Sequence, residues 1–412
     1  MILFYLLVSL APMPNHPLFE EPFAGLTLIK WLGIFCCAYA FLRLTRYSRL
    51  PSFMKSWQAR FFAVLYGIAI ISFVTLSKTE GLTFSPMATY FSYLLFFFVT
   101  ISVVNSYQRL HNTLLAAIAG SAWASLYVIR EFQLSGGTNL RPGYVAGDSN
   151  YFATCTLLVL PLAVYFAKFG SSRLERWFCG ACLILILSAF TLASSRGALV
   201  GLGVLAVYMI LRSGESRRSA ILVALLLLPL LLFAPASPLS RMLNPNYGDY
   251  VGAQVRRDFW RVGLHMIWTH PFTGIGLGNF TAQSFTFSQG LEGKHGIACN
   301  TFLEVTAELG IPGLLAYCAM IGGAFFSAAK LRAEGRRQHD KLLQYTGQAL
   351  QAGLLGFSAA AIFISAEYQK PFWVVIALSA TVPNLVRQQV RKQSRQTKPF
   401  GMPTSNIAPA EV

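Results

Sequence analysis

A short polar segment in the last third of the chain contains the residues best suited to proton transfer. It runs Lys294-His295-Gly296-Ile297-Ala298-Cys299-Asn300 and precedes a helical pattern. The imidazole of His295 could act as a general base near neutral pH, although a single histidine in a loop is more often a bystander. Thr301 and Glu304 have the spacing of a capping box, which predicts that a helix begins there. The free N–H groups at such a helix start favour an anion beside it.

Arg141 and Arg196 each precede an apolar segment, and either could bind such an anion. Arg196 lies in the tight turn Ser194–Ala198, where its planar guanidinium could bind phosphate through two hydrogen bonds or merely extend to a membrane interface. Arg141 opens a segment rich in turn residues. It could equally be an ordinary surface arginine with no ligand. The helix after this segment can be capped by Asp148, Ser149 or Asn150.

Two further arginines, Arg256 and Arg257, begin the segment 256–270, which has apolar residues at helical spacing. Pro271 and the alternating glycines up to Gly278 predict a compact turn after it. The glycines lack the GxGxxG spacing of a dinucleotide site, so they are weak evidence for phosphate binding. An exposed pair of Arg257 with Asp258 is the alternative, and such a pair would contribute little to stability.

The elements that must position these residues are membrane helices. The chain has 412 residues, of which 55% are hydrophobic and 12% charged, and its mean hydropathy is +0.52. Its apolar runs match a bilayer core of about 30 Å, which predicts an all-α polytopic membrane protein with about 12 transmembrane helices. The expected spans are 1–12, 24–42, 61–77, 88–107, 113–129, 151–167, 178–193, 198–211, 220–236, 311–329, 345–364 and 372–386.

Charge placement orients these helices. With a cytoplasmic N-terminus, roughly two thirds of the 33 Lys and Arg residues fall on the cytoplasmic side, which places both termini in the cytoplasm of a bacterial inner membrane. The predicted units are the N-terminal helices 1–236, a large periplasmic loop 237–310 with short helices, the C-terminal helices 311–386 and a basic tail 387–412 expected to be disordered. The first span lacks a basic n-region and a cleavage site, so we expect it to be retained.

Several ligand classes are not supported. The net charge of +17 reflects cytoplasmic loops rather than nucleic-acid binding. Six of the seven cysteines lie in expected spans, which supports neither a disulfide framework nor a zinc site, and no cofactor is expected. Basic residues that remain in the outer loop suggest an anionic ligand instead, although long loops are translocated regardless of charge.

Four motifs together resemble the O-antigen ligase/polymerase superfamily. The segment Asn300–Glu304 with Glu308–Leu314 resembles the signature at which the family's long periplasmic loop re-enters the membrane. Segments 148–150, 195–198 and 256–280 agree in order, so the resemblance covers about 141–315. It implies an inverting, metal-independent GT-C glycosyltransferase that moves a glycan from undecaprenyl diphosphate to lipid A–core (a ligase), to a growing polysaccharide (a polymerase) or to a protein.

The resemblance also implies roles for individual residues. Arg196 and Arg256 occupy the positions of the family's diphosphate-binding arginines, and Arg257 and Arg141 would assist. The family has histidine, its presumed base, directly before the asparagine equivalent to Asn300, whereas this chain has Cys299. Either His295 supplies the imidazole, or Cys299 acts as a thiolate with its ordinary pKa of ~8.5 lowered by the arginines, or the chain is inactive or altered.

A transporter or flippase for a lipid-linked anionic substrate is the alternative from another class. Transporters favour ionisable residues near the membrane midplane and repeated halves. Here only Lys30 lies clearly within an expected span, and no internal repeat is evident. The expected partners are therefore the undecaprenyl diphosphate-linked donor, a lipid A–core or glycan acceptor, and membrane lipids, with no nucleic acid.

Overall fold

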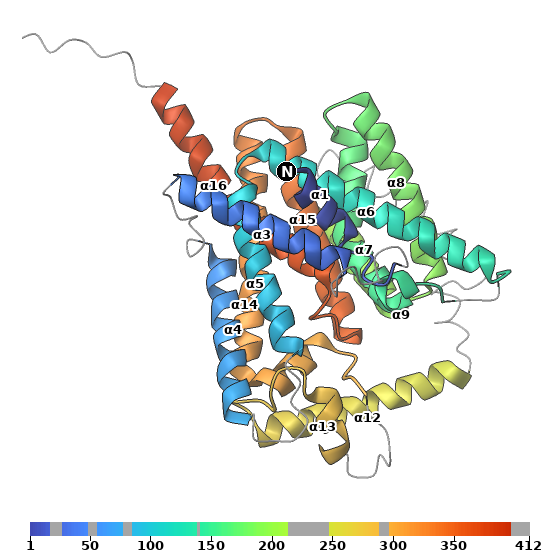
Figure 1. The fold of residues 1–412 in the computed structure, drawn as a ribbon. Coiled ribbons are helices and arrows are strands. Elements are labelled where there is room, and N and C mark those ends of the chain that lie inside the picture. Colours follow the sequence, from blue (N-terminus) through green and yellow to red (C-terminus); the bar gives the residue numbers. More distant parts are fainter. Residues whose placement is uncertain are drawn as a thin grey trace, which may run out of the picture.

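The computed structural model describes residues 1–16, 27–47, 56–76, 85–137, 141–212, 247–287 and 296–396. Over these ranges every regular element is a helix and none is a strand, so the predicted all-α class is confirmed (Figure 1). The elements are α1 (Ile2–Leu10), α3 (Leu28–Tyr47), α4 (Trp57–Leu76), α5 (Ser85–Val103), α6 (Tyr107–Leu134), η2 (Tyr144–Ala146), α7 (Ser149–Phe169), α8 (Arg173–Leu192), α9 (Arg196–Arg212), α12 (Tyr247–Thr269), α13 (Phe280–Phe287), α14 (Thr301–Arg337), α15 (Lys341–Ala360), η4 (Ala361–Phe363) and α16 (Lys370–Gln396).

Six of these helices are long and apolar enough to cross a membrane, namely α4, α5, α6, α7, α8 and α14. The chain is therefore a multi-pass membrane protein. The count of about twelve spans stays a prediction. Helix α1 has 9 residues, which is only about 14 Å of helix against a bilayer core of about 30 Å. The expected span 220–236 lies outside the described residues.

Helix α7 forms the centre of the bundle. Every side chain from Phe152 to Phe166 is buried, so protein surrounds this helix on all sides, and its main neighbours are α8 and α15. Glycines let α15 approach closely: a Cβ at Gly353 would lie 2.8 Å from the Leu158 carbonyl oxygen, and one at Gly201 of α9 would lie 2.4 Å from the Gly356 carbonyl oxygen. Small residues at helix contacts are the usual means of close packing in membranes.

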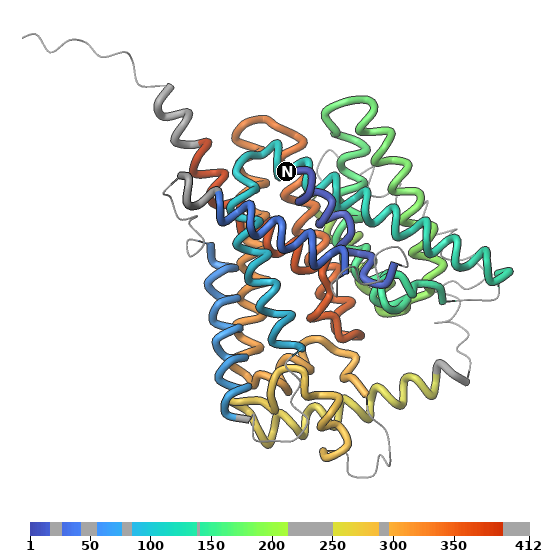
Figure 2. Tube along the Cα trace, viewed as in Figure 1, coloured from blue at the N-terminus to red at the C-terminus, as the bar shows by residue number. Residues whose placement is uncertain are grey.

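Helices α7, α9, α14 and α16 begin at the same end of the bundle, where α12 and α13 also lie (Figures 1 and 2). The Ser72 hydroxyl near the end of α4 donates to the Thr273 carbonyl oxygen at 3.0 Å, which ties α4 to the turn after α12. The predicted helix in 256–270 is confirmed, but α12 begins earlier, at Tyr247. We call this end of the molecule the α12 end.

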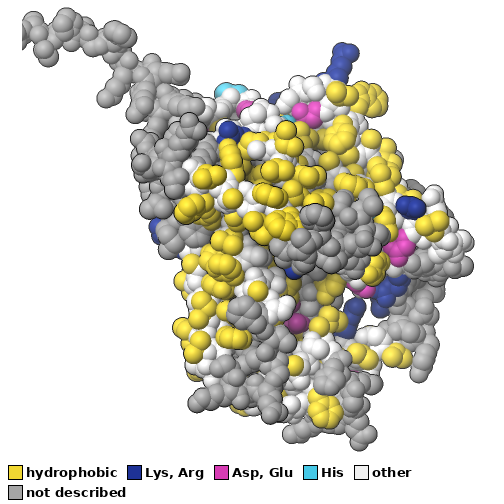
Figure 3. Space-filling view, viewed as in Figure 1, with side chains coloured by type: hydrophobic (Ala, Val, Ile, Leu, Met, Phe, Trp, Pro, Cys, Tyr) yellow, Lys and Arg dark blue, Asp and Glu magenta, His cyan; other side chains and the backbone are white. Residues whose placement is uncertain are grey.

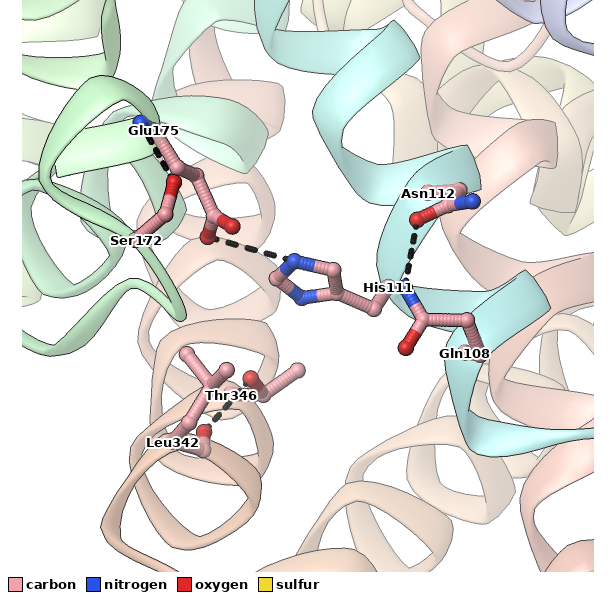
Figure 4. Close-up of polar contacts among 7 residues, drawn as sticks. All are labelled: Gln108, His111, Asn112, Ser172, Glu175, Leu342 and Thr346. Atoms are coloured by element: carbon pink, nitrogen blue, oxygen red, sulfur yellow. Dashed lines mark hydrogen bonds and ion pairs between the residues drawn. The ribbon is translucent and has the colours of Figure 1, made fainter.

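The opposite end carries acid–base pairs. His111 Nε2 of α6 lies 3.1 Å from Glu175 Oε1 of α8, and the Ser172 hydroxyl caps α8 by accepting from Glu175 N at 3.1 Å (Figure 4). Arg337 Nη2 of α14 lies 2.6 Å from Glu334 Oε1. Several basic residues lie in the helix turns here: Lys168, Arg173, Arg176, Arg336 and Lys341. This is the arrangement that the sequence predicts for the cytoplasmic side, and the orientation in the membrane stays a prediction.

Candidate functional site

The start of α14 is the centre of the candidate site. The helix begins at Thr301 as predicted, but the predicted capping box of Thr301 and Glu304 is wrong. Asn300 is the N-cap, and its side-chain oxygen accepts from Phe302 N at 3.1 Å and Leu303 N at 3.2 Å. Asparagine is among the strongest N-cap residues. It takes this position because the backbone N–H and hydroxyl of Thr301 both bind elsewhere.

Their partner is the segment 364–367 that leads into α16. The Thr301 N–H and hydroxyl donate to the Ile364 carbonyl oxygen at 3.0 and 2.7 Å, and Ala366 N donates to the Thr301 hydroxyl at 2.8 Å. Glu304 Oε2 accepts from Ala298 N at 3.1 Å and from the Ser365 hydroxyl. Segment 364–367 therefore belongs to the site, although its residues were not among the sequence candidates. Its only sequence signal is a short polar interruption between two apolar helices.

Helix α12 brings Arg256 to this helix start. Phe259, Val262 and Met266 of α12 are buried in a small core shared with α13 and α14, as their spacing predicted. Arg256 precedes Phe259 by three residues and so lies on a similar face of the helix. Its charge acts on the Cys299 thiol. Arg257 is exposed, and its guanidinium donates to Gln254 Oε1 at 2.7 Å.

The environment of Cys299 differs from the one expected. Its φ of 50° is in the left-handed region, and its side chain is half-buried. Burial raises the pKa of the Cys299 thiol, and Arg256 offsets only part of that rise. The expectation that arginines lower this pKa is therefore wrong, because the net effect of the surroundings is to raise it. A thiol with a raised pKa remains protonated near neutral pH and is a poor proton acceptor.

Helix α7 contributes the polar residues at its first turn. Asp148 is its N-cap and accepts from Asn150 N at 2.6 Å, which selects one of the three predicted capping residues. Tyr151 lies within electrostatic range of Asp148, Cys299 and Glu304. The motif at 148–150 and the segment at 299–304 therefore meet in space, although about 150 residues separate them in the sequence.

The glycine-rich turn supports α14. Gly274, Gly276 and Gly278 all have positive φ, at 64°, 99° and 78°. The backbone N–H of Gly276 donates to the carbonyl oxygen of Glu308 at 2.9 Å, and Phe280 N donates to Glu308 Oε1 at 3.1 Å. These donors therefore hold α14 at its bend, where Gly310 has φ 71°. The turn is a structural support, which agrees with the weak sequence evidence for phosphate binding.

The other predicted arginines lie around this centre. Arg196 is the first residue of α9, after a turn in which Ser194 has φ 50°. The next residue, Gly197, packs against Phe363, since a Cβ there would lie 2.9 Å from Phe363 Cβ. Arg196 therefore begins α9 beside the segment that leads to 364–367. Arg141 is exposed ahead of α7.

Two sequence expectations remain outside this geometry. His295 lies outside the described residues. The Arg257–Asp258 pair is not formed, because Asp258 instead faces Arg261 at 3.6 Å and accepts from Gln254. Within the described ranges, no group of three or more His, Cys, Asp or Glu side chains is arranged to hold a metal ion.

The molecular surface shows basic side chains where α12 meets the helical bundle. In Figure 3, Lys and Arg side chains lie beside a hollow between α12 and the bundle, with Asp and Glu side chains close by. A hollow of this kind, with cationic side chains next to a membrane bundle, could bind an anionic headgroup.

Part of the chain matches a known protein family. Residues 181–318 match a family model described as O-antigen ligase. The matched segment is about a third of the chain and includes Arg196, Arg256, Cys299 and Asn300. The match supports the resemblance to the O-antigen ligase/polymerase superfamily. No curated protein matches the chain.

Proposed function

We propose, from the O-antigen ligase match over residues 181–318, that this chain transfers a glycan from undecaprenyl diphosphate to an acceptor. The acceptor is lipid A–core for a ligase or a growing polysaccharide for a polymerase. One observation carries the proposal: α12 places Arg256 at the Cys299–Asn300 segment, where α14 begins. A cationic side chain and a polar helix start therefore lie together at one end of a membrane bundle.

Arg196 and Arg256 would bind the diphosphate of the donor. A diphosphate next to lipid is costly to bury unless its charges are paired, and guanidinium groups pair with phosphate oxygens through two hydrogen bonds each. The same groups would stabilise the negative charge that develops on the leaving diphosphate. Arg141 and Arg257 are exposed, so we assign them contacts farther out on the donor.

The α12 end would face the periplasm. The opposite end carries the basic helix turns, and basic residues favour the cytoplasmic side. This orientation would place both termini in the cytoplasm of a bacterial inner membrane. The acceptor hydroxyl would meet the donor at the Cys299–Asn300 segment, with His295 in the adjoining loop. The reaction would invert the sugar configuration and need no metal ion or cofactor.

A catalytically inactive member that binds the same donor is the second candidate. One observation favours it, namely that burial raises the pKa of the Cys299 thiol at the position where the family has histidine. The substitution Cys299→His separates the two readings. An inactive wild-type chain that gains transfer with Cys299→His supports the second candidate.

The direct test uses the purified chain in liposomes with a defined undecaprenyl diphosphate-linked glycan and candidate acceptors. The proposal predicts a glycan–acceptor product and free undecaprenyl diphosphate. Movement of the labelled donor between leaflets without bond transfer would instead support a flippase. The identity of the acceptor that gives product decides between ligase and polymerase.

A further inference from the structure

Three carboxyl groups are buried beneath the candidate site. Glu304 and Glu308 belong to α14 and are 4% and 2% exposed, and Glu367 precedes α16 and is 2% exposed. Each lies within electrostatic range of the other two. Lys and Arg are the usual partners of buried carboxylates, yet no ion pair joins any of these three among the described residues.

The three groups differ in their hydrogen bonds. Glu308 Oε1 accepts from Phe280 N and holds the glycine-rich turn. Glu304 Oε2 is held by Ala298 N and the Ser365 hydroxyl. Within the described part of the chain, Glu367 Oε2 has no hydrogen-bond partner. The fully buried hydroxyls of Tyr90 and Tyr317 also have no partner there, and both lie within electrostatic range of Glu367.

A buried polar atom without a hydrogen-bond partner reduces the stability of the folded protein. Such groups are found more often at functional sites than elsewhere. Burial, followed by the charges of Glu304 and Glu308, raises the pKa of Glu367 well above its ordinary value. Buried carboxyls that lie this close share protons, and they release and take them up as a unit. The cluster can therefore keep a proton at a higher pH than an ordinary exposed carboxylate can.

The position of Glu304 connects this cluster to the reaction. Ala298, whose N–H donates to Glu304, directly precedes Cys299. The carboxyl of Glu304 is therefore bound to the residue that directly precedes Cys299. Cys299 is the position at which the resemblance implies a histidine. Cys299 is protonated near neutral pH, because burial raises the pKa of its thiol. The proton acceptor that this position lacks is present immediately beside it.

We propose that Glu304 accepts the proton of the acceptor hydroxyl in this chain, and that Glu367 acts as a positioning residue that shares the proton. The proposal rests on the proposed transferase function. The acceptor oxygen forms a bond to the sugar carbon that carries the diphosphate. The bond from that carbon to the diphosphate oxygen breaks, and its electron pair leaves with the diphosphate. The hydroxyl proton moves to the carboxylate of Glu304, from which it passes to Glu367 or to water.

The titratable groups that lie within electrostatic range of the Glu304–Glu367 pair come from four parts of the structure: Tyr90 and Tyr93 of α5, Tyr151 of α7, Glu308 and Tyr317 of α14, and Cys299 and Tyr368 of the flanking segments. None of these groups is a cation, and Arg256 acts on Cys299 instead, where it would bind the donor. An additional proton on the buried pair therefore reduces the repulsion between neighbouring carboxylates.

The test compares Glu304→Gln, Glu367→Gln and the control Glu334→Gln in the full chain, reconstituted with a defined undecaprenyl diphosphate-linked donor and an accepted acceptor. Glu334 is also a buried glutamate of α14, but it lies at the opposite end and pairs with Arg337. Glu304→Gln should lower kcat by about 10²-fold or more, the usual contribution of a general base, while the KM for the donor stays close to that of the wild type. Glu334→Gln should retain the wild-type kcat.

The pH profile separates proton transfer from a structural role. The wild-type rate should rise with pH as the pair loses its proton, and Glu304→Gln should lose this rise. Glu367→Gln should move the rise to lower pH, because a neighbouring negative charge no longer opposes ionisation of Glu304. If Glu304→Gln folds and keeps the wild-type kcat and pH profile, the inference is overturned while the transferase function stands. If the wild type forms no product with any donor, the proposed function fails instead.

A second pair of variants covers the case in which Glu304→Gln misfolds. Glu304→Asp keeps a carboxyl group and should retain transfer with a pH-dependent rise. Adding Cys299→His to Glu304→Gln supplies an imidazole beside the lost carboxylate and should restore transfer at least tenfold. Loss of activity in both Glu304→Gln and Glu304→Asp, with no rescue of Glu304→Gln by Cys299→His, would assign Glu304 a structural role and overturn the proposal.

Discussion

The two ends of the helical bundle differ in the partners of their buried and half-buried glutamates. At the end opposite α12, His111 pairs with Glu175, and Glu334 pairs with Arg337. At the α12 end, Glu304, Glu308 and Glu367 are buried together without a basic partner among the described residues, and Arg256 acts on a thiol. The His111–Glu175 pair joins α6 to α8 and the Glu334–Arg337 pair lies within α14, whereas unpaired buried charges are retained where a substrate or a proton must bind. This contrast is the main structural argument for a reaction site at the α12 end.

The largest expected effect is the loss of transfer when the cationic side of the site is removed. Arg256→Ala and Arg196→Ala should each lower the transfer rate by at least about 10²-fold, because each removes a donor to the leaving diphosphate. Arg337→Ala, at the opposite end, is the matched control and should leave transfer near the wild-type rate. Product formation from a defined donor is the measurement. Unchanged transfer in both Arg196→Ala and Arg256→Ala would contradict the assignment.

A large effect on folding is expected at the glycine-rich turn. Gly274 has φ 64°, and a Cβ there would lie 2.2 Å from the Glu308 carbonyl oxygen. Gly274→Ala should therefore reduce the free energy of unfolding by more than ~1 kcal/mol, the range for an alanine in an incompatible conformation. Gly180→Ala is the control, because nothing lies within 4 Å of a Cβ at that position in α8. Thermal unfolding in detergent would compare them, and equal midpoints would refute the packing argument.

Loss of a helix cap at either end should reduce stability by a similar amount, but the consequences for activity should differ. Asn300 caps α14 at the α12 end, and Asp340 caps α15 at the opposite end by accepting from Leu343 N at 3.0 Å. Replacing either residue with alanine should cost about 1 kcal/mol of stability. Only Asn300→Ala should also lower transfer, since it disturbs the segment next to Cys299. Equal activity losses in both variants would remove this distinction between the ends.

The smallest expected effect concerns the reactivity of Cys299. Burial raises the pKa of its thiol and Arg256 lowers it in part, so the thiolate fraction at neutral pH is below that of an ordinary cysteine and increases as pH rises. Arg256→Gln removes the opposing charge, raises this pKa further and should slow alkylation of Cys299 at pH 7. Mass spectrometry of the Cys299 peptide would measure the rate. Faster alkylation in Arg256→Gln would mean that Arg256 does not favour the thiolate.

Local patterns predicted much of the fold. Apolar runs located the described α-helices apart from α12 and α13, and the alternating glycines up to Gly278 predicted a compact turn because their positions require positive φ. The helical spacing of Phe259, Val262 and Met266 predicted the buried face of α12. That face in turn directs Arg256 inward and leaves Arg257 exposed. These features depend on residues close together in sequence, so sequence alone could predict them.

Features that depend on distant contacts were missed. Thr301 and Glu304 match a capping box, but both side chains bind the segment 364–367, and Asn300 becomes the N-cap instead. The contribution of Glu367 could not be predicted, because only the fold brings it beneath α14. The net direction of the Cys299 pKa also required the structure, since the arginine was evident in the sequence whereas the extent of burial was not.

An experimental structure of the chain with bound undecaprenyl diphosphate tests the central claim most directly. The account predicts that the two phosphates lie between the guanidinium groups of Arg196 and Arg256, next to Cys299 and Asn300 at the start of α14. Phosphates bound at the opposite end, or at the α12 end without contact to either arginine, would contradict it.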